Sequence, residues 1–313
     1  GFLQNWLHGK EVSKAKNTLR NYAQTVERFL ASIGGRAKLG IAAISPKDVS
    51  DFRDAEIASG KNPNTVRYAV KHLRVPFNAA RRQGIITTNP AEAVELPGAT
   101  ESEDGGHTSR KPFSPEHVAA LLDAATAREN GRPVFDDGKD WQGAILFANY
   151  TGARIGDAAN ITWKAIDLAA GKITFRPQKT KREVLIPIHP ALESHLLDLS
   201  APHSDKAFVF PKLAGLRTAT LGQRFTKIME RAGIVNAVIA AARGTKGRTV
   251  NAFSFHSLRH KFNSDMANAG VAQEIRKKFT GHSSDAMNTH YTHHELELLR
   301  AEIGKLPGIG KRH

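Results

Sequence analysis

Residues 255–291 constrain the chain most, because polar groups suited to phosphate chemistry lie there on or next to short predicted helices. His256 and Arg259 lie three residues apart and share one helix face. A second short helix should deliver His282, and Tyr291 follows nine residues later. A His, an Arg, a second His and a Tyr suit binding a phosphodiester and attacking it with a phenol. The apolar residues of the first helix recur at helical spacing and predict one buried face: Phe255, Leu258, Phe262, Met266 and Ala269.

The charge of the chain points to a polyanionic partner. Its 313 residues leave room for two domains, and 45 Lys and Arg against 30 Asp and Glu give a formal net charge of +15. DNA or RNA fits such a charge best. A membrane is the weaker option, since no apolar run approaches the roughly 20 residues that a spanning helix needs. The absence of cysteine excludes disulfides and thiolate chemistry, which is consistent with a cytoplasmic protein.

The hydrophobic pattern changes between two parts of the chain. Residues 1–98 predict an all-helical domain, and residues 99–112 a polar, Gly-containing linker. Residues 113–313 predict a second domain that mixes helices with short strands. Polar residues that can accept hydrogen bonds from a first helical turn mark the predicted helix starts, at Thr18, Ser45, Asn64 and Ser114.

A basic stripe accompanies the apolar face of the helix predicted near residues 65–82. Its members are Arg67, Lys71, Arg74 and Arg81. A solvated surface is the simpler explanation of such a stripe. Its charge is of one sign, without Glu partners at i,i+4, which favours contact with phosphates. The basic end of the linker, Arg110 and Lys111, could follow a nucleic-acid backbone in the same way.

The second domain carries a predicted hairpin between two helical regions. A buried helix should break at Thr151-Gly152, just before Arg154. Residues 172–175 and 183–188 predict two strands joined by a basic tip that carries Lys179, Lys181 and Arg182. Residues 218–232 predict a helix, and residues 233–250 a connection that includes a basic loop.

These motifs together resemble the tyrosine recombinases, the family of phage integrases and Xer-type site-specific DNA recombinases. Residues 151–157 (Thr-Gly-Ala-Arg-Ile-Gly-Asp) match its first arginine box, and residues 256–260 (His-Ser-Leu-Arg-His) match its second. Residues 281–282 (Gly-His) and Tyr291 match the closing motif and the nucleophile, with the family's spacing. Lys179 falls where the family carries a catalytic lysine. One box alone would be weak evidence, whereas four in the right order are specific.

The resemblance implies a fold. It covers most of residues 113–300, and residues 1–98 resemble the family's core-binding domain in shape and order. We therefore expect a mainly α protein with a small antiparallel β-sheet in the catalytic domain. The two domains should form a C-shaped clamp around duplex DNA.

The resemblance also implies a mechanism. The catalytic residues would be Arg154, Lys179, His256, Arg259, His282 and Tyr291. Tyr291 would form a 3′-phosphotyrosyl link while the two arginines clamp the phosphate oxygens. His256 would help to deprotonate the phenol, His282 would donate to the phosphate, and Lys179 would protonate the leaving 5′-oxygen. Asp157 would steady the arginine region from behind. No metal and no other cofactor is expected.

Partners and role follow from the same resemblance. We expect a DNA integrase that binds double-stranded recombination sites as a homo-tetramer on two sites, with accessory DNA-bending proteins as further candidates. The protein would work in the cytoplasm at the nucleoid, integrating or excising a mobile element. The alternatives are an Xer-like resolvase of chromosome or plasmid dimers, a type IB topoisomerase, and a non-catalytic DNA-binding regulator.

Some residues keep a second interpretation. His256 and His260 could begin a zinc site, although a metalloprotease helix would carry Glu where Ser257 stands. Lys181 is the rival of Lys179 as the catalytic lysine. The apolar stripe of the last helix should pack onto a neighbouring protomer, with packing onto its own domain as the alternative. That stripe consists of Leu296, Leu299, Ile303 and Leu306.

Overall fold

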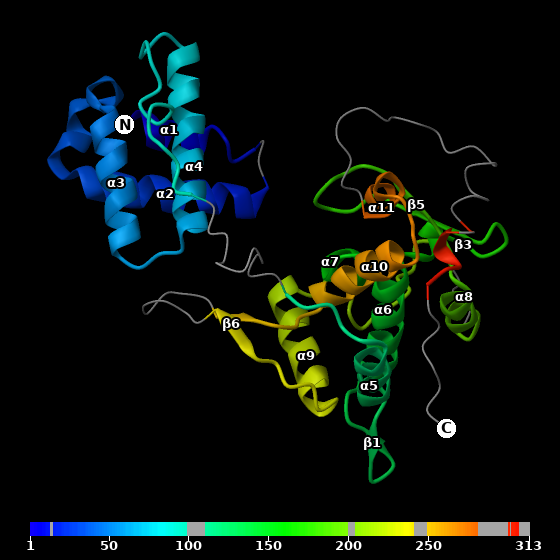
Figure 1. Cartoon of the computed structure of the whole chain (residues 1–313). Helices are drawn as coiled ribbons and strands as arrows, with labels where there is room; N and C mark the ends of the chain where they lie inside the picture. Colours follow the sequence, from blue (N-terminus) through cyan, green and yellow to red (C-terminus); the bar gives the residue numbers. More distant parts are fainter. Residues whose placement is uncertain are drawn as a thin grey trace. The chain divides into compact units, whose positions relative to one another are not determined.

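The computed structural model describes residues 1–12, 15–98, 110–199, 204–240, 249–280, 300 and 302–306. This part of the chain is mainly helical, with short antiparallel strands, which confirms the predicted fold class. It divides into two compact units, Gly1–Thr108 with Ala240–Val250 and Ser109–Ile239 with Asn251–His313 (Figure 1). None of the helices described is both long and apolar enough to cross a membrane.

The first unit is a set of helices around one apolar core. Its elements are α1 (Phe2–His8), α2 (Lys16–Ile33), the 3-10 helices η1 (Gly34–Leu39) and η2 (Ile41–Ala43), α3 (Pro46–Ala58) and α4 (Pro63–Arg82). Phe29 on α2 meets Phe52 on α3 and Phe77 on α4 edge to face, with ring centroids 5.5 and 6.1 Å apart. All three rings are buried, so they hold these helices together.

Two of the four predicted helix starts, Ser45 and Ser114, are confirmed. Ser45 and Ser114 each accept a hydrogen bond from the backbone N–H three residues on, with proline in the first helical position. The helix expected at Asn64 starts one residue earlier, with Asn62 as its cap. Thr18 is not a cap, because α2 begins before it at Lys16 without any side-chain cap.

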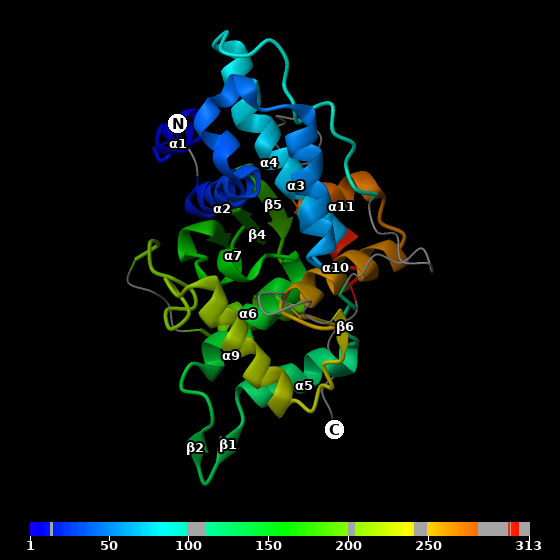
Figure 2. The same cartoon turned by 90° about the vertical axis from the view of Figure 1, so that its left-hand side faces the viewer.

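The second unit combines helices with short strands. Its helices are α5 (Pro115–Ala125), α6 (Gly138–Thr151), α7 (Ile155–Ala159), the 3-10 helix η3 (Trp163–Ala165), α8 (Pro190–Leu197), α9 (Thr218–Arg231), α10 (His256–Asn268) and α11 (Gln273–Thr280). The first strands are β1 (Arg128–Glu129), β2 (Arg132–Pro133), β3 (Ile166–Asp167), β4 (Lys172–Phe175) and β5 (Val184–Pro187). The β1–β2 hairpin extends beyond the ends of α5 and α9 (Figure 2).

The strands confirm the predicted hairpin. β3, β4 and β5 form one antiparallel sheet in which the buried Ile173 and Ile186 lie opposite each other. The chain between β4 and β5 forms the basic tip. Within residues 233–250, β6 (Val238–Ala240) pairs with β7 (Val250–Asn251), which the sequence did not indicate. Its basic loop, residues 241–248, lies outside the described residues.

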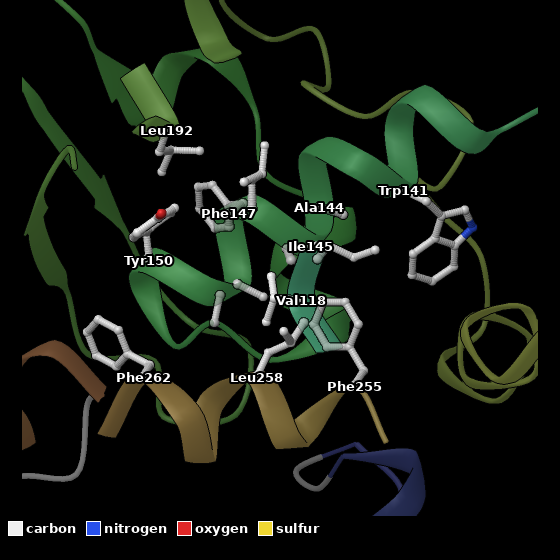
Figure 3. Packing of buried hydrophobic residues seen from close by; sticks show 14 of the residues in the cluster. Val118, Trp141, Ala144, Ile145, Phe147, Tyr150, Leu192, Phe255, Leu258 and Phe262 are labelled. Carbon is white, nitrogen blue, oxygen red and sulfur yellow. The ribbon is translucent and has the colours of Figure 1, made fainter. Parts of the chain in front are cut away.

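Helix α6 is the centre of the second unit's core. It packs against α5, α7, α8 and α10, and Trp141, Ile145 and Tyr150 on it are fully buried. Figure 3 shows Leu258 and Phe262 of α10 pointing toward α6. A helix that is apolar on nearly every side must be enclosed. The end of α6 and the start of α10 are thereby held in one rigid framework.

The described end of the last helix packs onto its own unit. Ile303 and Leu306 are 2% and 5% exposed and belong to the second unit's core. The Leu306 carbonyl oxygen lies 3.3 Å from His189 Nε2. The prediction that this stripe packs onto a neighbouring protomer is therefore wrong for these two residues, because their apolar surface is already covered. Leu296 and Leu299 lie outside the described residues.

Candidate active site

The turn after α6 places the first predicted arginine. Thr151 Oγ1 donates to the Phe147 carbonyl oxygen (2.6 Å) and accepts from the backbone N–H of Ala153 (3.2 Å). Gly152 takes the left-handed conformation, φ 63° and ψ 20°, which glycine adopts at low cost. Arg154 is extended and precedes α7. The Thr-Gly-x-Arg motif thus encodes a helix stop that turns Arg154 out of α6.

Helix α10 brings the second predicted arginine to the same turn. Arg259 is 5% exposed, and its Nη1 donates to the Gly152 carbonyl oxygen at 2.7 Å. A Cβ on Gly152 would lie 2.7 Å from Phe262 Cδ1, so α10 leaves no space for a side chain there. Burial and the charge of Arg154 lower the pKa of Arg259 to about 10, and it stays protonated at neutral pH. Two cations therefore lie close together in the second unit: Arg154, which is half-buried, and Arg259, which is buried.

A pocket of about 450 Å³ opens beside Arg154. Its lining consists of Arg110, Arg154, Ile155, Gly156, Asp157, Gln178, Lys179, Thr218 and His256. The Nη1 of Arg154 is buried and has no hydrogen-bond partner among the residues that the structure describes. An unsatisfied buried donor of this kind costs about 1–3 kcal/mol. An anionic oxygen entering the pocket would remove that cost.

Asp157 ties the hairpin tip to the arginine turn. The residue is 8% exposed, and its Oδ1 accepts a hydrogen bond from the backbone N–H of Gln178 at 2.8 Å. Lys179 follows directly and lines the pocket. Lys181 has a left-handed φ of 57° and does not belong to the lining. The placement favours Lys179 over Lys181 as the lysine of the site.

His256, the first residue of α10, supplies a neutral imidazole to the pocket. Its ring lies 4.8 Å from that of His260, edge to face. The residue keeps an exposed surface, yet partial burial, followed by the charges of His260, Arg259, Arg110 and Arg154, lowers the pKa of His256 to about 4. An imidazole that is neutral at pH 7 can accept a proton, as a general base must.

Two predicted catalytic residues lie outside the described residues. Helix α11 ends at Thr280, so His282 and Tyr291 follow where the structure describes nothing. Their roles therefore stay predictions. Among the described residues, no group of three or more His, Cys, Asp or Glu side chains is placed to hold a metal.

The basic stripe of α4 is used largely within its own unit. Arg74 donates to the carbonyl oxygens of Ala91 (3.0 Å) and Val94 (3.1 Å), and Arg81 pairs with Glu92 at 2.9 Å. Arg67 Nη1 lies 3.5 Å from the Pro97 carbonyl oxygen. These contacts hold the segment after α4 against the helix. Lys71 is exposed, with its ammonium 5.8 Å from the centre of the Tyr68 ring. Phosphate contact by this stripe stays a prediction.

The comparisons with known proteins decide the family. The model of the phage integrase family matches residues 113–297, and that of the phage integrase SAM-like domain matches residues 1–96. The chain belongs to the phage integrase family. It is a tyrosine site-specific recombinase, an enzyme that transfers DNA strands, with a SAM-like core-binding domain followed by the catalytic domain.

Its relatives include tyrosine recombinases of the Xer type. Tyrosine recombinase XerC of Oceanobacillus iheyensis is 24% identical over 301 residues, covering 93% of this chain and 90% of that protein. Tyrosine recombinase XerD of Pseudomonas aeruginosa is 26% identical over 314 residues, covering 96% and 92%.

Solved structures of integrases share the fold of this recombinase. A lambda integrase dimer bound to a COC′ core site gives a TM-score of 0.65 at 17% identity, covering 96% of this chain and 94% of that one. The Tn1549 transposon integrase in complex with transposon right end DNA gives 0.65 at 16% identity, covering 95% and 96%.

Arg110 and Thr218 line the pocket of this recombinase but were not predicted as catalytic residues. Arg110 was expected to follow the DNA backbone from the linker, and Thr218 was assigned no role. Both line the pocket beside Arg154 and His256. They come from the start of the second unit and from α9, so no local spacing in the sequence connects them to either motif.

Proposed function

We propose that this recombinase cleaves and rejoins DNA at specific sites through a 3′-phosphotyrosyl link to Tyr291, with a Holliday junction as intermediate. Integration or excision of a mobile element is the role that we favour. The arrangement of the pocket carries the proposal: Arg154, Lys179 and His256, from three separate elements, line one cavity. These groups supply a phosphate clamp, a proton donor and a proton acceptor.

The proposed exchange assigns a role to each of these groups. The Tyr291 oxygen attacks phosphorus, and the bond from phosphorus to the 5′-oxygen breaks. The phenol proton passes to His256, and Lys179 gives a proton to the leaving 5′-oxygen. Arg154 and Arg259 balance the charge that builds on the non-bridging oxygens.

The reverse reaction rejoins DNA. A 5′-hydroxyl attacks the phosphotyrosyl phosphorus and releases the Tyr291 oxygen. Because the covalent link stores the energy of the original phosphodiester, resealing requires no nucleotide cofactor. His282 is the remaining proposed donor to the phosphate.

The proposed partners are double-stranded recombination sites bound by a homo-tetramer. The solved lambda integrase structures include a dimer on a core site and a tetramer on a Holliday junction, which support this assembly by analogy. A net charge of +15 also suits a DNA partner. Accessory DNA-bending proteins and a cytoplasmic, nucleoid-associated location belong to the same proposal.

A nicked suicide substrate tests the chemistry. Inverted repeats in the DNA that flanks the gene supply the candidate site. The nick lets the short 5′-hydroxyl strand diffuse away, so the parent protein should accumulate as a covalent adduct with the site. Tyr291→Phe should bind the same DNA and form no adduct. An adduct that persists in Tyr291→Phe, or none in the parent on a site that it binds, would refute the proposed chemistry.

Dimer resolution is the second candidate, favoured by Xer relatives that match over nine-tenths of the chain. Recombination between two copies of one site would support it. Recombination only between two different sites would support integration.

A further inference from the structure

Arg110 lies within the active pocket, not merely next to the linker. Its side chain lines the cavity together with Arg154 and His256. Residues 99–109, which precede it, lie outside the described residues. Arg110 is half-buried. A residue of an exposed linker would have been more accessible to solvent.

One backbone hydrogen bond and one ring contact hold the segment that carries Arg110 in place. The backbone N–H of Lys111 donates to the Ala252 carbonyl oxygen at 2.8 Å. Phe113, which is 2% exposed, stacks on Phe253 with ring centroids 5.0 Å apart and planes 9° from parallel. Ala252 and Phe253 lie four and three residues before His256, the first residue of α10. The segment that carries Arg110 is therefore attached to the segment that starts the helix of His256.

The charge of the pocket exceeds what one phosphate would balance. Arg110, Arg154 and Lys179 are cationic, and Asp157 is the one carboxylate that the described residues contribute to the lining. That carboxylate already accepts the backbone N–H of Gln178. Arg259, which is buried and close enough to Arg154 for its pKa to be lowered by that charge, adds a further cation. A phosphodiester carries a single negative charge, so the remaining positive charge favours a second backbone phosphate near the pocket.

We propose that Arg110 is a further DNA-binding residue of the active pocket, whose guanidinium binds the backbone phosphate next to the scissile one. The inference rests on the proposed function, because it assumes that DNA enters this pocket. A guanidinium donates through a planar fork that matches two phosphate oxygens. Holding the neighbouring phosphate would fix the register of the strand, so that the scissile phosphate meets Arg154.

The charge of Arg110 also lowers the pKa of His256, the proposed proton acceptor. The same charge contributes, after burial, to the low pKa of both His256 and His260. Arg154 and Arg259 act on His256 in the same direction. Removal of Arg110 should therefore raise the pKa of His256. The acid limb of the cleavage profile should move to higher pH, which a purely structural role would not cause.

A binding cycle tests the contact without any cleavage. In a Tyr291→Phe background, each phosphate at and beside the scissile position is replaced in turn by a neutral methylphosphonate. Neutralising the neighbouring phosphate should weaken binding about 10- to 100-fold when Arg110 is present. With Arg110→Gln the same replacement should have little effect, because the partner charge is gone. Arg110→Lys should retain part of the coupling.

The control is Arg132→Gln, the same change of charge on the β1–β2 hairpin, outside the pocket lining. It should leave both the coupling and the cleavage rate as in the parent. No coupling between Arg110 and any phosphate, or coupling to the scissile phosphate alone, would overturn the inference. Because binding is measured without the nucleophile, its failure is distinct from a failure of the proposed chemistry, which the covalent adduct reports.

Discussion

Replacing Gly152 by alanine should damage both the fold and the site. The left-handed conformation costs an L-residue about 1–2 kcal/mol. The added Cβ would lie 2.7 Å from Phe262 Cδ1, and overpacking a core of this kind costs about 1–3 kcal/mol. Together the two terms predict a loss of about 2–5 kcal/mol. Because the Gly152 carbonyl oxygen accepts from Arg259, any shift of the turn also moves that guanidinium.

Calorimetry of the full chain measures the effect. At about 2–4 °C per kcal/mol, the expected loss lowers the melting temperature of the second unit by roughly 4–20 °C. Any transition that belongs to the first unit should stay in place. Covalent adduct formation with the nicked substrate should also slow at a temperature where the variant is still folded.

A second glycine supplies the matched control. A Cβ added to Gly222 on α9 would meet no atom of a neighbouring segment within 4 Å, and the φ of Gly222 is not left-handed. Gly222→Ala should keep or raise stability by up to about 1 kcal/mol. Combining Gly152→Ala with Phe262→Leu should recover the part of the loss that comes from the steric contact. A melting temperature within about 1 °C of the parent for Gly152→Ala would refute the account, as would equal effects at both glycines.

Two further predictions concern titration and proton transfer. The pKa of His256 is about 4, below the usual value of about 6.5, so the unfolded chain binds more protons between those pH values. The free energy of unfolding should fall as the pH falls through that window. Between pH 7 and pH 5, urea unfolding should show a smaller drop in this free energy for His256→Gln than for the parent. Equal losses would contradict the assignment. Lys179→Ala should slow cleavage about 10²–10⁴-fold, with recovery on a substrate whose leaving atom is a 5′-sulfur, which needs no proton. Lys181→Ala should reduce the cleavage rate less, and by the same factor on the ordinary and the 5′-sulfur substrate. If the 5′-sulfur substrate restores cleavage by Lys181→Ala instead, Lys181 is the proton donor and Lys179 is not.

Local patterns in the sequence determined much of the fold. Ser45 and Ser114 cap their helices because a hydroxyl followed by proline satisfies the first turn wherever it occurs. The two strand-like runs at residues 172–175 and 183–188 predicted the hairpin, and Gly152 marked the end of α6. Each of these depends on neighbours within a few residues. The two arginine boxes were found for the same reason, since each is one short turn or helix start.

Only the tertiary structure decided which of these groups meet. Arg259 reaches the carbonyl oxygen of Gly152, 107 residues away, and Arg110 joins the same pocket from the start of the second unit. Arg74 looked like a phosphate contact but donates to backbone oxygens of its own unit. Ile303 looked available to a partner, yet the core of its own unit covers it. Helical spacing of residues in the sequence predicts which face of a helix is apolar or charged. Which surface covers that face depends on how distant segments pack, and spacing along the chain carries no record of it.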